Sequence, residues 1–272
     1  MRNKIILGSA NFNQIYGIKK NFIREQEIKK LFNFAWKNKI RTIDTSPLYN
    51  QSEKIIGSLN KNRFKIISKV PKIPLNIKRK NIEKWIKQTT IHSLKNLKIK
   101  RFECLLLHNT DCLLGKNGNE IYQSLKNIKK KKMTKQIGIS IYDYTMLKKI
   151  IKKFKFDLIQ APLNILDQRL VKSGWLQKLK NKKIKVHARS IFLQGVLLLK
   201  HNKLPKRLKK LTKSWIVWEK WLKKNKLTPL KVCLASVFSH NNLDGVVVGY
   251  NSTKQLKQIL KLKDEKKKLF YS

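Results

Sequence analysis

Four polar residues of different chemical types follow apolar runs at separate places in the chain. Asp44 ends the first of these runs, and Tyr49 comes five residues later in a loop that contains a proline. Lys69 and His108 close two further apolar runs. A segment this apolar holds an ionisable group at a high free-energy cost unless the group is paired or faces a cleft. The four residues are therefore candidates for one shared site.

A carboxylate, a phenol, an ammonium and an imidazole can together perform proton-coupled carbonyl reduction. A tyrosine has an ordinary pKa of ~10, and a nearby ammonium lowers it by favouring the phenolate. Lys69 can supply that ammonium, and Asp44 can hold it protonated and oriented. His108 can donate a hydrogen bond to the substrate oxygen. This chemistry predicts Asp44, Tyr49, Lys69 and His108 as catalytic residues.

The elements that must position these residues are short apolar runs alternating with amphipathic helical stretches. A longer segment, 190–211, interrupts the alternation, and Ser52 is predicted as the N-cap of the second helix. The predicted strands are 4–7, 41–44, 64–68, 102–107, 136–140, 157–160, 184–188 and 243–248. The predicted helices are 24–38, 52–59, 82–97, 120–131, 144–154, 169–181, 213–224, 230–239 and 252–262.

Eight strands that are apolar on both faces and alternate with helices predict a closed parallel sheet. We expect an α/β chain folded as a single (β/α)8 TIM barrel over residues 1–272. An open doubly wound sheet is the rival, but it normally carries a glycine-rich fingerprint after its first strand, which this chain lacks. Barrel active sites lie at the carboxyl ends of the strands. The polar residues that close the predicted strands are Asn11, Asp44, Lys69, His108, Asn109, Ser140, Gln160 and Arg189.

The composition excludes several other classes of protein. The formal net charge is +49, yet only nine of the 64 basic residues are arginines, and no nucleic-acid-binding motif is present. Specific readers of nucleic acid rely on arginine for bidentate contacts, so we interpret the lysines as a solvated surface. Three cysteines without paired spacing predict reduced thiols and no metal site. No apolar run approaches ~18 residues, so no membrane insertion is expected and the protein is predicted to be cytoplasmic. The oligomeric state is open.

With these residues in hand, the sequence resembles the aldo-keto reductases over nearly its whole length. The most specific piece is IDTSPLYNQSEKIIG, which contains Asp44 and Tyr49, followed downstream by the lysine of IISKV and the histidine of ECLLLHN. The other matching pieces are LGSANF, QIGIS, LIQAPLN, HARSIFLQGVLLL and VVVGYNSTKQL.

This resemblance implies a barrel that binds NADPH, with NADH as the alternative, and acts on a small-molecule aldehyde or ketone. Tyr49 would give the proton while the nicotinamide gives the hydride. The matching positions for the cofactor are Ala10, Asn11, Ser140, Gln160, Arg189, Gly249, Tyr250, Asn251, Ser252 and Thr253. The chain departs from the family pattern at Ile141, Arg189, Gln255 and Ile259. These four positions affect how tightly the cofactor binds and whether NADP or NAD is preferred.

Two other functions stay open at this stage. The barrel could bind the cofactor as a sensor or regulatory subunit without turnover, although the four candidate catalytic residues are all present. Alternatively, the basic surface could bind polyanions, in which case the affinity would fall steeply with salt and would not depend on Tyr49. The substrate is not predicted beyond a carbonyl compound, with a sugar derivative as one candidate.

Overall fold

The computed structural model describes residues 4–12 and 23–264, with the side chains of residues 263 and 264 excluded. Eight parallel strands close into a barrel in sequence order, and β1 pairs with β8 to complete it. The strands are β1 Ile5–Gly8, β2 Thr42–Asp44, β3 Lys65–Val70, β4 Phe102–Leu107, β5 Thr134–Ser140, β6 Leu158–Pro162, β7 Lys185–Arg189 and β8 Gly245–Gly249. The predicted (β/α)8 TIM barrel is therefore confirmed.

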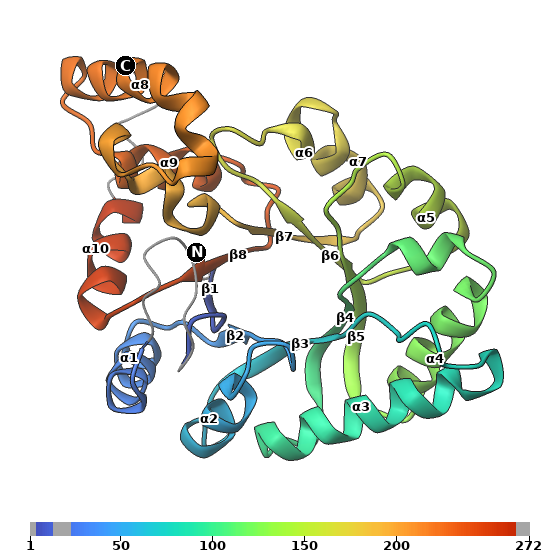
Figure 1. Cartoon of the computed structure of the whole chain (residues 1–272). Coiled ribbons are helices and arrows are strands. Elements are labelled where there is room, and N and C mark those ends of the chain that lie inside the picture. The colour runs from blue at the N-terminus through green and yellow to red at the C-terminus, as the bar shows by residue number, and fades with distance from the viewer. Residues whose placement is uncertain (1–3, 13–22, 265–272) are drawn as a thin grey trace.

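Helices ring the barrel on the outside (Figure 1). They are α1 Glu25–Lys37, α2 Ser52–Leu59, α3 Ile82–Leu97, α4 Gly118–Lys130, α5 Leu147–Lys153, α6 Arg169–Lys172, α7 Trp175–Asn181, α8 Thr212–Lys224, α9 Pro229–Phe238 and α10 Thr253–Asp264. Short 3-10 helices are η1 Arg79–Asn81, η2 Asp111–Leu114, η3 Leu193–Leu198, η4 His201–Lys203 and η5 Lys206–Leu211. The last three occupy the long segment predicted at 190–211.

Two hydrophobic layers hold this arrangement together. The inner layer fills the barrel with side chains from alternate strand positions: Ile6, Ile67, Cys104, Leu106 and Leu158, with Val247 packed against them. The outer layer lies between the strands and the helices and is much larger. Because successive strand residues point to opposite faces, the sequence runs that look apolar throughout supply both layers.

Three sequence predictions about the elements are wrong in detail. The helix predicted at 169–181 is two helices, because Gly174 takes a positive φ of 74° and ends the first one. The helix predicted from residue 144 begins at Leu147. Ser52 is the first residue of α2 and does not cap it; its hydroxyl instead donates to the carbonyl of Ser9 at 3.1 Å. That bond ties the start of α2 to the end of β1.

Candidate active site

A buried ion pair joins the ends of β2 and β3. Nζ of Lys69 lies 2.6 Å from Oδ1 of Asp44 and donates a second bond to the carbonyl of Thr45 at 2.9 Å. The two side chains are 1% and 4% exposed. Burial is the largest single effect and works to lower the pKa of Lys69, but the charges of Asp44 and Tyr49 and the hydrogen bond to Asp44 together raise it above its ordinary value. The lysine is thus a fixed ammonium at the carboxyl end of the barrel.

Tyr49 lies over this ammonium. Its amide donates to the carbonyl of Ser46, in a turn followed by Asn50 with a positive φ of 42°. The turn places the aromatic ring with its centroid 5.2 Å from Nζ of Lys69. The side chain is only half-buried, so it combines contact with the ion pair and access from outside.

His108 completes the group from the end of β4. Its ring lies edge-on to that of Tyr49, with 6.5 Å between the centroids. Burial first, and then the charges of Lys69 and Arg189, lower the pKa of His108 to about 4. The imidazole is therefore neutral at pH 7. Its Nδ1 is buried with no hydrogen-bond partner among the described residues, which leaves Nε2 as the nitrogen that can serve a substrate.

Gln160 and Ser140 lie side by side on β6 and β5 in the same register. Nε2 of Gln160 donates to Oδ2 of Asp44 at 2.7 Å. Both carboxylate oxygens of Asp44 are thus engaged, one by an ammonium and one by an amide. Oγ of Ser140 is buried with no partner in the described part of the chain. The contact between Gln160 and Asp44 was not predicted, because residues 116 positions apart give no local signal.

Arg189, at the end of β7, is held by three contacts. Its guanidinium stacks on the ring of Tyr142 with Cζ 4.0 Å from the centroid. It donates to the carbonyl of Ile141 at 2.8 Å and to Oγ of Ser190 at 3.1 Å. Tyr142, which is 60% exposed although aromatic, was not predicted from the sequence. An aromatic residue two positions after the strand-end Ser140 was the available signal.

The remaining predicted residues lie together where β1 and β8 meet. Nδ2 of Asn11 donates to the carbonyl of Tyr250 and to Oδ1 of Asn251, the latter at 2.8 Å. A Cβ built on Gly249 would have no atom within 4 Å, so the chain leaves open space there. Ala10 precedes Asn11 in the turn after β1.

In two residues of this loop, Tyr250 and Thr253, the side-chain polar group is either buried or already hydrogen-bonded. The amide and hydroxyl of Thr253 both donate to Oε1 of Glu27 at 2.8 Å. The phenol of Tyr250 is buried in the core, so this residue can offer only backbone groups to a ligand. Ser252 accepts a bond from the amide of Gln255 and caps α10. The structure thus forms two groups: the catalytic candidates with Ser140, Gln160 and Arg189, and a loop group at β1 and β8.

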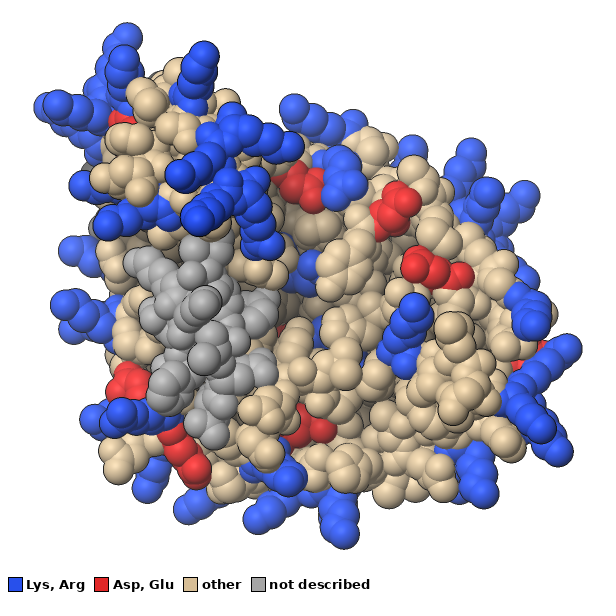
Figure 2. Space-filling view, viewed as in Figure 1, with Lys and Arg blue, Asp and Glu red and all other residues tan. Residues whose placement is uncertain are grey.

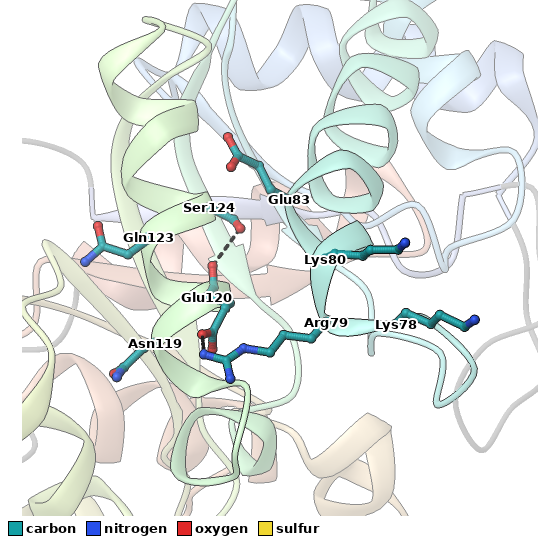
Figure 3. A pocket seen from close by; sticks show the side chains of 8 residues that line it. All are labelled: Lys78, Arg79, Lys80, Glu83, Asn119, Glu120, Gln123 and Ser124. Carbon is teal, nitrogen blue, oxygen red and sulfur yellow. Dashed lines mark hydrogen bonds and ion pairs between the residues drawn. The ribbon is translucent and has the colours of Figure 1, made fainter.

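A separate open cavity of about 720 Å³ lies on the outside of the barrel between the η1–α3 and α4 segments (Figure 3). Three of its charged groups have partners: Arg79 pairs with Glu120, and Glu83 accepts a bond from Asn127 at 3.0 Å. No predicted site residue lines it. Among residues 4–12 and 23–264, no three His, Cys, Asp or Glu side chains cluster as metal ligands would. No helix in the same ranges is long and apolar enough to cross a membrane.

Comparison with known proteins agrees with this architecture. The Aldo/keto reductase family model matches residues 4–268. The fold is similar to that of a Pseudomonas aeruginosa protein assigned as an aldo-keto reductase, with 17% identity, a TM-score of 0.71, and coverage of 98% of this chain and 91% of that one. It is also similar to the aldo-keto reductase AKR11C1 from Bacillus halodurans in its holo form, with 18% identity, a TM-score of 0.72, and coverage of 95% and 86%.

No curated protein gives a significant match. At these identities the solved structures support the fold, whereas the family match covers nearly the whole chain. The chain therefore belongs to the Aldo/keto reductase family of oxidoreductases, and family and fold together imply NAD(P)H-dependent carbonyl reduction.

Proposed function

We propose that the protein reduces an aldehyde or ketone with NADPH, and that Tyr49 gives the proton. The observation that carries this proposal is the buried pair of Lys69 and Asp44 beneath the ring of Tyr49, with a neutral His108 alongside. Core packing alone would not place an ammonium, a phenol and an imidazole around one opening. Removing charges from water costs free energy, so a buried ion pair at the mouth of the barrel indicates a role other than packing.

The residues at the strand ends fit a nicotinamide cofactor. Oγ of Ser140 is buried without a partner in the described residues, and the amide of Gln160 lies in the same row. Both can hold a carboxamide. We propose that Arg189 lies beside the nicotinamide ring. When bound, the cofactor supplies a hydride to the carbonyl carbon.

The outer part of the cofactor is assigned to the loop group at β1 and β8. We propose that Ala10, Asn11 and the residues Gly249, Tyr250, Asn251, Ser252 and Thr253 receive the pyrophosphate and the adenosine ribose. The open space at Gly249 allows a close approach of the backbone. NADPH is the proposed cofactor and NADH the alternative. Lys254 and Lys257 are exposed on the adjoining α10, where their ammonium groups can attract the additional phosphate of NADPH. Ile259 on the same helix is buried and offers no polar group to the cofactor.

The roles of the catalytic candidates follow from their contacts. His108, neutral at pH 7, donates through Nε2 to the substrate oxygen and fixes its position. Tyr49 transfers its phenolic proton to this oxygen as negative charge develops on it. The ammonium of Lys69, 5.2 Å from the ring centroid, stabilises the phenolate that is left. Asp44 keeps Lys69 charged and in place, and Gln160 keeps Asp44 in place. Alcohol oxidation uses the same contacts in reverse.

A screen of aldehydes and ketones tests this proposal. Purified protein is mixed with NADPH or NADH separately, and nicotinamide absorbance is followed with aromatic, aliphatic and sugar aldehydes. Carbonyl-dependent oxidation of the cofactor is the expected result. Binding of NADPH without oxidation by any carbonyl compound would instead support a sensor or regulatory barrel.

A further inference from the structure

The side chain of Arg189 points into the mouth of the barrel. A Cβ on Gly245 would collide with Ile6 of the inner layer and with the ring of His187 at 2.7 Å, so His187 points inward. Arg189 is two residues further along β7 and lies on the same face. It is also the last residue of that strand, at the carboxyl end where Lys69 and His108 lie.

Its guanidinium is held in one orientation before any ligand binds. The plane stacks on Tyr142, and two of the five N–H groups donate to Ile141 and Ser190. Nε is buried with no partner in the part of the chain that the structure describes. Because the buried Nε is shielded from a ligand, two N–H donors remain, one on each terminal nitrogen. A guanidinium held in this way can bind a carboxylate or a phosphate through both of them.

The charge of Arg189 is not neutralised by a carboxylate. The nearby Lys69 is paired with Asp44, and Arg169 binds Asp167 through two bonds of 2.9 and 2.8 Å. No Asp or Glu among the described residues lies within 4.0 Å of the Arg189 guanidinium. Arg189 therefore has no direct carboxylate partner in the described part of the chain, and the charge of Asp167 acts on it only from a longer distance.

Basic side chains gather on one side of the opening (Figure 2). The segment 200–210 presents exposed cations and contains no Asp or Glu; they are Lys200, Lys203, Lys206, Arg207, Lys209 and Lys210. Figure 2 shows a hollow over the barrel strands with Lys and Arg side chains gathered beside it, and several Asp or Glu side chains also lie near it. Lysines cover this whole molecule, so they attract anions in general. Arg189 is one of only nine arginines, and it is the one with a fixed position at the catalytic candidates.

We propose that Arg189 is a specificity-determining residue that selects carbonyl substrates carrying a carboxylate or a phosphate group. In this proposal Arg189 stays beside the nicotinamide ring, and its remaining N–H donors bind the anionic group of the substrate while Tyr49 and His108 act on the carbonyl oxygen. This inference rests on the proposed carbonyl reduction and adds the class of substrate to it.

Pairs of related aldehydes with and without an anionic group test the inference. The first pair is 4-formylbenzoate and its methyl ester, and the second is glyceraldehyde 3-phosphate and glyceraldehyde. For the wild type, kcat/KM for one charged member should exceed that for its neutral partner by about ten- to a hundredfold, as expected for charge-assisted hydrogen bonds. The pair that shows the larger ratio distinguishes a carboxylate from a phosphate.

Variants of Arg189 and Arg207 show which residue causes the preference for the charged aldehyde. Arg189→Gln should reduce this ratio to nearly one, and Arg189→Lys should restore only part of it, because an ammonium lacks the planar fork. Arg207→Gln removes an equal charge from the exposed η5 segment and should keep the wild-type ratio. A wild-type ratio near one in both pairs would overturn the inference, as would an equal loss of preference in Arg189→Gln and Arg207→Gln.

Two further measurements separate this inference from the proposed reaction. NADPH affinity is measured for each variant, and a loss of affinity with an unchanged ratio would assign Arg189 to the cofactor alone and overturn the inference. If no aldehyde is reduced, the proposed reaction fails. Calorimetric titration of 4-formylbenzoate and its ester into wild type and Arg189→Gln then decides the anion selectivity: a preference for the acid that depends on Arg189 supports it, and equal binding refutes it.

Discussion

At the scale of single residues, Asp44 is the centre of the site. One oxygen accepts from the ammonium of Lys69 and the other accepts from the amide of Gln160, so the carboxylate joins a candidate catalytic residue to a candidate cofactor residue. A buried ion pair stabilises little in comparison with a well-packed apolar pair, but breaking it by removing one partner leaves an unpaired charge. We therefore expect the candidate site to be sensitive to the loss of either charge.

Replacing Lys69 tests this sensitivity. Lys69→Met removes the charge and keeps the volume, which leaves the carboxylate of Asp44 buried without its ammonium. We expect the free energy of unfolding in urea to fall by about 3–5 kcal/mol. Lys135→Met breaks a more exposed pair with Glu103, with side chains 39% and 22% exposed, and should change it by less than about 1 kcal/mol. Similar losses in the two variants would contradict the account.

At the scale of elements, the sequence predicted what hydrophobic pattern controls and missed what long-range contact controls. All eight strands were predicted within a few residues, because burial on both faces leaves a continuous apolar signal. The break at Gly174 was missed because glycine is tolerated inside a helical pattern until its φ becomes positive. Ser52 looked like a helix cap, but its hydroxyl binds a carbonyl 43 residues away.

The same limit applied to the site. Asp44, Lys69 and His108 were predicted as strand-end residues, and the structure places them in direct contact with one another or with Tyr49. The position of Tyr142 after Ser140 gave a local signal, but its stacking with Arg189 could not be predicted from spacing. It depends on two strands that are distant in sequence, and no periodicity reports it.

The close packing of α2 on α3 gives a prediction at this scale. A Cβ on Gly57 would lie 2.1 Å from the carbonyl oxygen of Asn96, a backbone atom that cannot move freely. Gly57→Ala should therefore lower the free energy of unfolding by about 1–3 kcal/mol, although alanine is normally the better helix former. Gly115→Ala is the matched control, since its Cβ would meet the carbonyl of Cys112 at 3.6 Å. Thermal denaturation that ranks the two variants the other way would refute this packing.

At the scale of the whole molecule, the barrel carries a very basic surface, and two of its histidines have lowered pKa values. Burial lowers the pKa of His187 and of His108 to about 4, from the ordinary 6.5. The unfolded chain therefore binds more protons than the folded one between these values, so stability rises with pH in this window. The contribution of these two histidines to the free energy of unfolding is fully present above pH 6.5 and is lost as the pH falls toward 4.

Urea unfolding at pH 7 and at pH 4.5 measures this dependence. The shift at the buried His187, from 6.5 to about 4, corresponds to about 3 kcal/mol if the full interval is crossed. His187→Gln should show a flatter dependence of stability on pH than the wild type. His92→Gln alters an exposed histidine on α3 and should retain the wild-type slope. A slope that is the same in all three proteins would contradict the buried, neutral state of His187.

The central claim, that Tyr49 transfers the proton, is tested most directly by single-turnover reduction of an aldehyde in stopped flow. NADPH-loaded wild type, Tyr49→Phe and Tyr122→Phe are compared; the last removes a phenol from the outer face, where its hydroxyl donates to the carbonyl of Lys155. The account predicts that Tyr49→Phe slows cofactor oxidation by about 10²- to 10⁴-fold, with NADPH affinity within about threefold of wild type, and that Tyr122→Phe keeps the wild-type rate. Cofactor oxidation by Tyr49→Phe at the wild-type rate would contradict it.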